Sequence, residues 1–299
     1  IPEWGDIVVD YVNEIDDELE IEQISDEEAY PFITWVGEEV DEAYYKAVMG
    51  IEINPGLDKS DFKIVYSPQH GADNIPVRTC LKRLGYDIVP VLAQCAPDPD
   101  FTNTKSPNPE VDASYELAIK LAKEVDADVV AITDPDGDRL GVVAKHNGEY
   151  VLMSGNQSAA VYLEYILSQR KEKGTLPDNA VMYNTIVTSD LGELVARNYG
   201  VDVEKTLTGF KFIGDKIRKY EKTHEKQFIF GYEESYGCVV EDFVRDKDAV
   251  QAVLLAAECG NYYKKQGKDL IDVLNELYAK YGTFKESQIA LAKAGAAGA

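Results

Sequence analysis

Apolar and polar positions alternate along the chain in two kinds of segment, which predict strands and helices in turn. Short apolar runs bounded by Gly, Pro or Asp are typical of buried strands, and longer stretches with an apolar residue every three or four positions are typical of helices. The predicted strands are residues 63–67, 86–93, 128–133, 141–145, 180–187, 201–207 and 227–231. The predicted helices are residues 7–15, 75–84, 113–125, 156–173, 190–199, 214–222, 248–260 and 269–281. Strands that alternate with helices indicate an α/β fold of sheets covered by helices.

This plan occurs twice, which predicts two consecutive α/β/α domains, each a mixed, mostly parallel sheet between helices. We place the first domain at residues 41–154 and the second at residues 155–283. Residues 1–40 start without Met and are strongly acidic, so we expect the end of a preceding domain and a connection there. Residues 284–299 end in an Ala- and Gly-rich run and are expected to be a linker or a poorly defined tail.

Charge and composition narrow the possible functions. The chain has 54 acidic and 30 basic residues, a formal charge of −24, which argues against nucleic acid or an anionic membrane surface as a partner. Its three His and four Cys are scattered, without the spacing of a zinc site, and free thiols indicate a reducing, cytoplasmic location. No stretch of the sequence is apolar for long enough to span a membrane. Because of the net charge, an anionic phosphate ligand would need a local cationic pocket.

The aspartate loop, residues 134–139 (Asp-Pro-Asp-Gly-Asp-Arg), directly follows a predicted strand. Asp134, Asp136 and Asp138 stand on alternate positions, so their carboxylates repel one another unless a cation lies among them. Oxygen ligands of this kind select Mg²⁺ or Ca²⁺ over softer metals. The loop therefore predicts a divalent-cation site, and a solvated turn explains three aspartates after a buried strand less well.

Two other classes of protein carry comparable acidic loops. An EF-hand has Gly at its sixth position and Glu at its twelfth, which are Arg139 and Lys145 here, so this class is excluded. A haloacid-dehalogenase-type phosphatase would use Asp134 as its nucleophile. Such enzymes normally have Thr or Val where Asp138 stands and carry the motif near the start of their domain. The phosphatase stays an alternative.

Two segments of the second domain contain groups that suit a sugar. In the glutamate loop, residues 231–237 (Gly-Tyr-Glu-Glu-Ser-Tyr-Gly), Glu233 and Ser235 can accept from and donate to neighbouring hydroxyls. Residues 208–214 form a Gly-bounded loop that contains Lys211. The alternatives are a polar turn and a solvated lysine.

Two basic residues, Arg245 and Lys247, stand just before the predicted helix 248–260. The free N–H groups at the start of a helix favour anions. These side chains would therefore supply the cationic pocket that a phosphate needs, and a surface ion-pair cluster is the competing explanation.

Together these segments resemble the α-D-phosphohexomutase family, most closely its bacterial phosphoglucomutase branch. The matching segments, in the family's order and spacing, are residues 133–139, 208–214, 231–237 and 244–250. The resemblance covers about residues 1–285 and implies the second and third of four α/β domains around one cleft. It implies an isomerase of carbohydrate metabolism that interconverts glucose 1-phosphate and glucose 6-phosphate with Mg²⁺, through a phosphoserine and a bisphosphate intermediate.

The resemblance also implies roles for individual residues. Asp134, Asp136 and Asp138 would bind Mg²⁺. Arg139 would steady the phosphoserine, and Lys247 would assist at the phosphate or at the reacting hydroxyl, which makes both catalytic. The implied substrate-binding residues are Thr208, Gly209, Lys211, Glu233, Ser235 and Arg245.

Two segments typical of the family are absent from the sequence. Its Ser-His-Asn-Pro loop is missing, since Ser106-Pro-Asn-Pro lies in the second-domain region and lacks the His, and its Arg-x-Ser-Gly-Thr loop is missing as well. We therefore expect the nucleophilic serine to lie outside this chain, in the missing first domain, and the fourth domain to be a further partner from the same protein. We also expect the chain alone to be inactive. The alternatives are a phosphomannomutase or phosphopentomutase of the same family and a non-catalytic sugar-phosphate-binding module.

Overall fold

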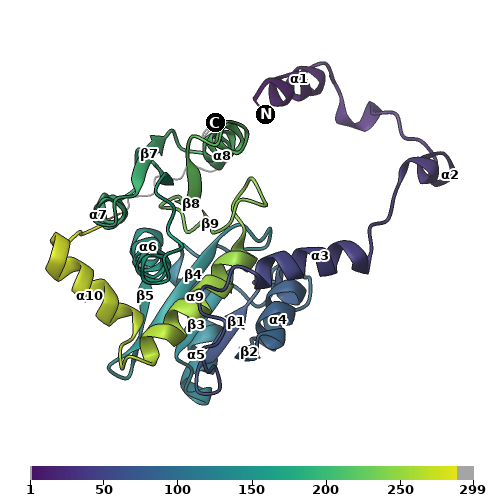
Figure 1. Cartoon of the computed structure of the whole chain (residues 1–299). Coiled ribbons are helices and arrows are strands. Elements are labelled where there is room, and N and C mark those ends of the chain that lie inside the picture. Colours follow the sequence, from purple (N-terminus) through teal and green to yellow (C-terminus); the bar gives the residue numbers. More distant parts are fainter. Residues whose placement is uncertain (1, 288–299) are drawn as a thin grey trace.

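Two β-sheets form the centre of the molecule, whose computed structural model describes residues 2–287 (Figure 1). The first sheet has the strand order β2–β1–β3–β4–β5, with β1 (Lys63–Ser67), β2 (Asp87–Pro90) and β3 (Val129–Thr133) parallel, and β4 (Leu140–His146) and β5 (Glu149–Met153) antiparallel. The second has the order β7–β6–β8–β9, with β6 (Ala180–Thr185), β7 (Asp202–Thr206) and β8 (Gln227–Tyr232) parallel and β9 (Cys238–Val239) antiparallel. Two α/β domains with mixed sheets are therefore confirmed, and parallel pairing in the first sheet extends only over β2, β1 and β3.

Helices cover both faces of each sheet. The described helices are α1 (Pro2–Asn13) and α2 (Asp26–Ala29) in the N-terminal part, and α3 (Glu38–Met49), α4 (Asn74–Arg83), α5 (Glu116–Val125), α6 (Gly155–Glu172), α7 (Leu191–Asn198), α8 (Phe210–Thr223), α9 (Ala249–Lys264) and α10 (Leu270–Tyr281) around the sheets. Short 3-10 helices lie at Glu18–Glu20, Tyr30–Phe32, Leu92–Gln94 and Asp112–Tyr115.

The side chains of each strand alternate between two apolar cores. In β1, Ile64 and Tyr66 face the large core, which α4, α6 and α9 share, whereas Val65 faces a smaller core beneath α5. In β6, Met182 faces the large core and Tyr183 faces α8. Each sheet therefore lies between two layers of helices, and the large core is continuous from one sheet to the other.

Helix α9 connects the two units. Sequence order places it in the second predicted domain, yet it lies across the first sheet, where it contacts β3 and β4 as well as α3 and α4 (Figure 1). Gly260 allows this approach, because a Cβ there would lie 2.6 Å from the ring of Phe62. Nearly every side chain of α9 is buried, as expected for a helix that is packed on all sides.

Helices α2 and α3 and strands β5 and β9 are absent from the sequence prediction. Strand β5 follows a tight turn at Asn147 and Gly148, whose φ angles of 50° and 85° are those of a two-residue hairpin. Strand β9 has two residues, and α3 has two buried residues, so neither produces a strong apolar pattern. Helix α8 begins at Phe210 rather than at residue 214. The glycine predicted to mark the start of the helix, Gly214, lies inside it.

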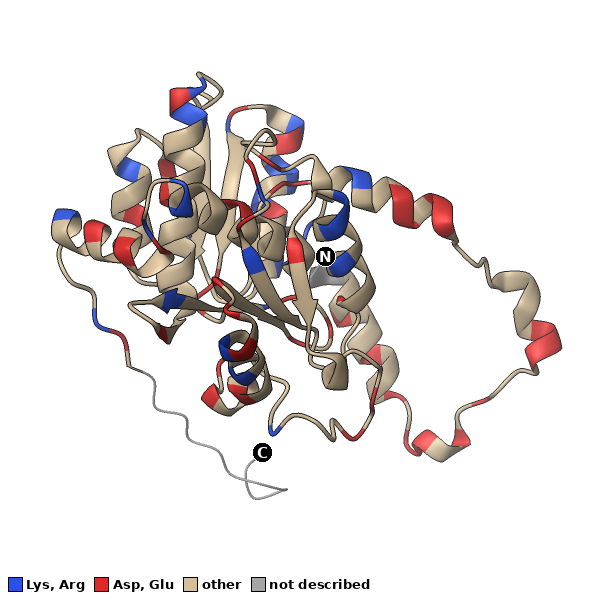
Figure 2. Ribbon diagram, turned by 90° about the horizontal axis from the view of Figure 1, so that it is seen from below, with Lys and Arg blue, Asp and Glu red and all other residues tan. Residues whose placement is uncertain are grey.

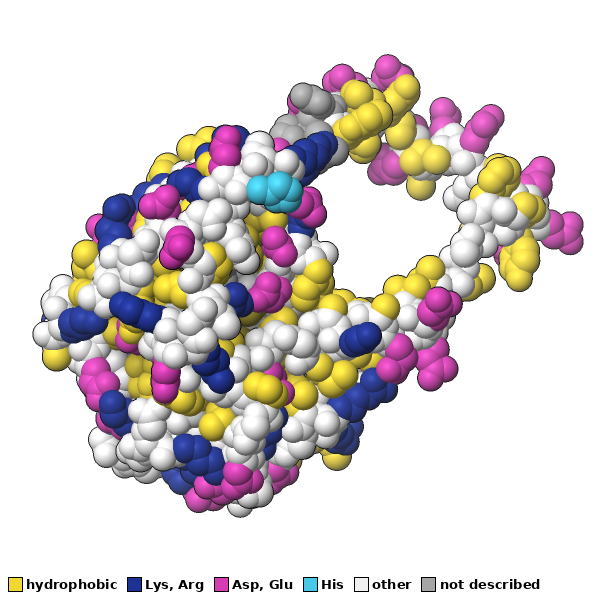
Figure 3. Space-filling model, viewed as in Figure 1, with side chains coloured by type: hydrophobic (Ala, Val, Ile, Leu, Met, Phe, Trp, Pro, Cys, Tyr) yellow, Lys and Arg dark blue, Asp and Glu magenta, His cyan; other side chains and the backbone are white. Residues whose placement is uncertain are grey.

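The N-terminal arm, residues 2–36, projects away from the two sheets (Figure 1). Its apolar side chains are exposed, among them Trp4 at 65% and Trp35 at 81%, and appear as yellow patches in Figure 3. Acidic positions recur along it, coloured red in Figure 2. No helix within residues 2–287 is long and apolar enough to cross a membrane. Of the expected tail 284–299, all but the first four residues lie outside the described part of the chain.

Candidate active site

Most of the predicted site residues gather where the carboxyl ends of β3 and β8 meet the N-terminal end of α9. The aspartate loop follows β3, and the glutamate loop begins in β8. The backbone N–H of Leu140 donates to the carbonyl of Tyr236 (2.9 Å), and the N–H of Ala249 donates to the carbonyl of Gly137 (3.0 Å). Loops from both sheets and the start of α9 therefore build one site.

Three carboxylates of the aspartate loop converge. Asp134, Asp136 and Asp138 each place one oxygen within 4.8 Å of the others. Oδ1 of Asp134 accepts the backbone N–H groups of Asp138 (3.1 Å) and Arg139 (2.9 Å), which closes the loop. The buried Oδ1 of Asp138 has no hydrogen-bond partner among the described residues. A set of carboxylate oxygens, one of them without a hydrogen-bond partner, fits a hard divalent cation such as Mg²⁺.

Negative charge is crowded around this loop. Burial, with the charges of Asp138 and Asp136 adding to it, raises the pKa of Asp134 to about 7. Burial and the charge of Asp248 raise the pKa of Asp73 to about 7 as well. Both shifts have the direction that burial and neighbouring like charges produce, so a divalent cation would be favourable among these carboxylates.

Asp73, which sequence reasoning missed, lies behind the turn of the aspartate loop. Gly137 has a φ of +75°, and a Cβ there would lie 2.8 Å from Cγ of Asp73. The preceding segment also packs on the loop, because a Cβ on Gly71 would lie 2.6 Å from the carbonyl oxygen of Pro135. The signal that could have found Asp73 is its place after β1, the parallel neighbour of β3.

Two cationic side chains border the aspartate loop. Nε of Arg139 lies 3.5 Å from Oδ2 of Asp134 and 3.6 Å from Oδ1 of Asp138, while its Nη1 donates to Glu110 (2.9 Å). Nζ of Lys247 lies 2.9 Å from Oδ2 of Asp138. Burial alone would lower the pKa of the Lys247 amine, but the hydrogen bond to Asp138 and the charges of Asp138, Glu233 and Asp246 together outweigh it and raise that pKa. Both residues predicted to be catalytic therefore lie at the loop.

Glu233 joins the glutamate loop to two other segments. Its Oε1 accepts the backbone N–H of Gly209 (2.8 Å), and its Oε2 lies 3.7 Å from Nζ of Lys247. The side chain of Lys247 packs directly against Gly237, since a Cβ at residue 237 would lie 2.9 Å from Cγ of Lys247 and would overlap its Cδ. Three segments that are separate in the sequence thus meet at one carboxylate.

A cleft of about 1320 Å³ opens beside these loops, with Glu234 and Ser235 on its wall. Thr185 Oγ1 donates to Oε2 of Glu234 (3.0 Å) and orients that side chain. Further lining residues include Glu110, Asp112, Asn156, Thr188 and Ser189. Hydroxyl, amide and carboxylate groups of this kind can both donate to and accept from the hydroxyls of a sugar.

Three predicted substrate-binding residues lie away from these contacts in the structure. Arg245 pairs with Glu221 of α8 (2.7 Å). Lys211 is exposed, with Nζ 5.2 Å from the ring centre of Phe212, and Thr208 is exposed on the loop before α8. The site assembled from the described residues thus contains Gly209, Glu233 and Ser235 from the predicted substrate-binding set.

Two family models match this chain. Residues 42–148 match the alpha/beta/alpha domain II of phosphoglucomutase/phosphomannomutase, and residues 154–281 match alpha/beta/alpha domain III. The chain belongs to the phosphoglucomutase/phosphomannomutase family. The resemblance seen in the sequence motifs is thereby confirmed.

Curated relatives and solved structures agree with this membership. A phosphoglucomutase from Staphylococcus haemolyticus is 34% identical over 283 residues, which are 93% of this chain and 50% of the relative. One from Staphylococcus epidermidis is 38% identical over 253 residues, 84% of this chain and 45% of the relative. A phosphoglucomutase/phosphomannomutase family protein from Burkholderia thailandensis shares the fold, with a TM-score of 0.62 and 20% identity over 80% of this chain and 46% of its own. The chain spans about half the length of the curated relatives that it matches.

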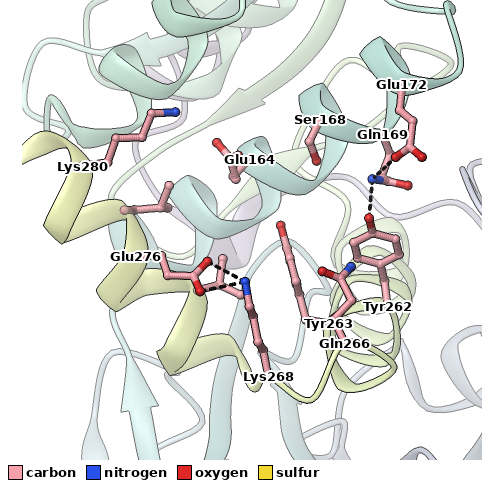
Figure 4. Close-up of a pocket in the computed structure, with 12 residues that line it drawn as sticks. Glu164, Ser168, Gln169, Glu172, Tyr262, Tyr263, Gln266, Lys268, Glu276 and Lys280 are labelled. Carbon is pink, nitrogen blue, oxygen red and sulfur yellow. Dashed lines mark hydrogen bonds and ion pairs between the residues drawn. The ribbon is translucent and has the colours of Figure 1, made fainter.

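A second cavity, of about 330 Å³, lies between α6, α9 and α10 (Figure 4). Several of its polar groups pair with one another: Lys268 pairs with Glu276 (2.7 Å), and Gln169 donates to the hydroxyl of Tyr262 (2.6 Å). Oε2 of Glu164 has no hydrogen-bond partner among the described residues. The contact of Gln169 with Tyr262 joins α6 to α9, and the pair of Lys268 with Glu276 joins the α9–α10 loop to α10, so we assign the cavity a structural role.

Proposed function

We propose that this chain is the metal- and sugar-binding part of a cytoplasmic, Mg²⁺-dependent phosphoglucomutase that interconverts glucose 1-phosphate and glucose 6-phosphate. The observation that carries the proposal is the position of Lys247, which lies 2.9 Å from Asp138 of the aspartate loop and 3.7 Å from Glu233 of the glutamate loop. A candidate phosphate site and a candidate sugar site are thus one side chain apart. The curated relatives named phosphoglucomutase favour glucose over mannose or pentose phosphates.

The residues around the aspartate loop suit phosphoryl transfer. Asp134, Asp136 and Asp138 would hold Mg²⁺, which would withdraw charge from the transferring phosphoryl group. Arg139 adds a fixed positive charge beside them in a planar geometry that matches phosphate oxygens. Lys247 holds a proton between two carboxylates, where it can hydrogen-bond the phosphate or the reacting hydroxyl.

The cleft supports a sugar that turns beside the aspartate loop, since its lining includes Glu110, the partner of Arg139. Its volume of about 1320 Å³ exceeds what one hexose phosphate fills, so a sugar has room to turn within it. The hydroxyl of Ser235 can donate in one orientation and accept in the other, and the carboxylate of Glu234 accepts in both.

The remaining parts of the reaction belong to the rest of the protein in this proposal. The chain spans about half the length of its relatives, and we propose that the nucleophilic serine and a phosphate-binding loop lie in the other half. The chain alone should then be inactive. Because the chain belongs to the phosphohexomutase family, we do not propose a haloacid-dehalogenase-type phosphatase acting through Asp134.

The test is a comparison of rates for the full-length protein on glucose, mannose and ribose 1-phosphates at saturating Mg²⁺. We expect the rate on glucose 1-phosphate to be the highest of the three. We expect no turnover by residues 1–299 alone. A higher rate on mannose or ribose 1-phosphate would assign the protein to that activity of the family. A full-length protein that binds these sugars and turns over none of them would be the non-catalytic module, and the proposal would be wrong.

A further inference from the structure

A buried carboxylate, Asp248, caps the N-terminus of α9 directly after Lys247. Its Oδ1 accepts the backbone N–H of Gln251 (3.1 Å), and its Oδ2 accepts the side-chain amide of the same residue (3.1 Å). Its own N–H donates to the carbonyl of Cys238 in β9 (3.1 Å). The position of Asp248 therefore determines where α9 begins.

The residues on either side of Asp248 contact the aspartate loop. Lys247 pairs with Asp138, and the N–H of Ala249 donates to the carbonyl of Gly137. A displacement of Asp248 would therefore move a cation and a backbone donor of the site at the same time.

One further donor reaches Asp248 from α3, 204 positions earlier in the chain. The hydroxyl of Tyr44 lies 2.9 Å from both carboxylate oxygens of Asp248. The ring of Tyr44 also packs edge-on against Phe243, with 6.4 Å between ring centres, on the segment that leads to Lys247. Tyr44 thus holds this segment by its hydroxyl and by its ring.

We propose that Tyr44 is a positioning residue of the candidate site: its hydroxyl holds Asp248 and thereby places Lys247 and the Gly137 turn of the aspartate loop. Tyr44 acts through Asp248, since the contacts of its hydroxyl among the described residues are with that carboxylate. The inference rests on the proposed function because it treats the aspartate loop as the metal site. One of the two measurements that test it needs no metal.

The test uses Tyr44→Phe, which removes the hydroxyl and keeps the ring. Tyr150→Phe is the matched control, because the half-buried Tyr150 donates to the carbonyls of Ala122 (2.8 Å) and Ala127 (2.7 Å), on the α5 side of the first sheet. Loss of a hydrogen bond to a charged group shifts a local equilibrium by about tenfold or more. In metal-free protein, amide hydrogen exchange at Ala249 and in the aspartate loop should therefore be about tenfold faster in Tyr44→Phe than in Tyr150→Phe.

The second measurement is the affinity of the chain for Mn²⁺, determined by electron paramagnetic resonance. Tyr44→Phe should bind Mn²⁺ about tenfold more weakly, at the lower end of what outer-shell groups contribute to metal affinity, and Tyr150→Phe should bind as wild type does. In a double-mutant cycle, the effects of Tyr44→Phe and Asp248→Asn on Mn²⁺ affinity should be less than additive.

The outcomes separate this inference from the proposed function. Exchange rates that are equal in Tyr44→Phe and Tyr150→Phe would overturn the positioning role, whether or not Mn²⁺ binds. Additive effects in the cycle would overturn the route through Asp248. Faster exchange in Tyr44→Phe from a chain that binds no Mn²⁺ would support the positioning role and remove the metal site from the proposed function.

Discussion

Replacing Gly137 by Ala should damage the aspartate loop far more than one added methyl group suggests. Gly137 has a φ of +75°, where a residue with a Cβ costs about 1–2 kcal/mol. The new Cβ would also lie 2.8 Å from Cγ of Asp73 and overlap its Oδ1. Asp73 is only 6% exposed, so relief of this contact requires the loop to move, which typically costs about 1–3 kcal/mol more.

Gly148→Ala separates these two contributions. Gly148 has a φ of +85° in the β4–β5 turn, and nothing lies within 4 Å of a Cβ placed there. It should therefore lose only the backbone contribution of about 1–2 kcal/mol, whereas Gly137→Ala should lose about 2–5 kcal/mol. Urea denaturation followed by circular dichroism measures both free energies of unfolding, and a Mg²⁺ titration of each variant should show weaker binding for Gly137→Ala alone.

The contact with Asp73 can be tested in the same assay. Adding Asp73→Ala to Gly137→Ala removes the overlapping carboxylate, so the double variant should recover part of the lost stability. Equal destabilisation by Gly137→Ala and Gly148→Ala would show that Asp73 does not support the loop.

Three further predictions concern pH and two side chains. The contribution of Asp134 to the stability of the metal-free chain should fall as pH rises from about 4 to about 7. The reason is that the pKa of Asp134 is raised to about 7 in the folded state, whereas the carboxyl of the unfolded chain has already lost its proton in this range. Urea titrations of wild type and Asp134→Asn across this range measure the difference. Arg245→Ala should cost less than about 1 kcal/mol, since Arg245 pairs with Glu221 at the surface, and a larger loss in the same assay would contradict that placement. Gly237→Ala should displace the Lys247 side chain from Asp138, so the mutase rate of the full-length protein should fall about tenfold or more, and an unchanged rate would contradict the placement of Lys247.

The sequence pattern was sufficient to predict those features of the structure that depend on residues close together in the sequence. The aspartate loop follows a strand that is buried along its whole length, so one short stretch of sequence contains both the strand and the three carboxylates that converge after it. Strand β5 shows the limit of this approach, because its four apolar residues (150–153) form too short a run to identify a strand by pattern alone.

The assembly of the site could not be read in this way. Lys247 meets Asp138 because α9 crosses from the second unit onto the first sheet, and no local pattern encodes that crossing. Asp73 was missed because its role depends on the absence of a Cβ at Gly137, more than sixty positions away. Arg245, by contrast, has the residue type and sequence position of a phosphate ligand, but its side chain pairs with Glu221 of α8.

The binding of Mg²⁺ to the aspartate loop is tested most directly by calorimetric titration of Mg²⁺ into this chain. We expect one ion per chain, and an affinity about tenfold or more lower in Asp136→Asn, where one of the three converging carboxylates is lost. Asp178→Asn makes the same change of charge at an exposed residue outside the site and should bind Mg²⁺ as wild type does. Equal affinities in the two variants, or no binding by the wild type, would contradict the metal site.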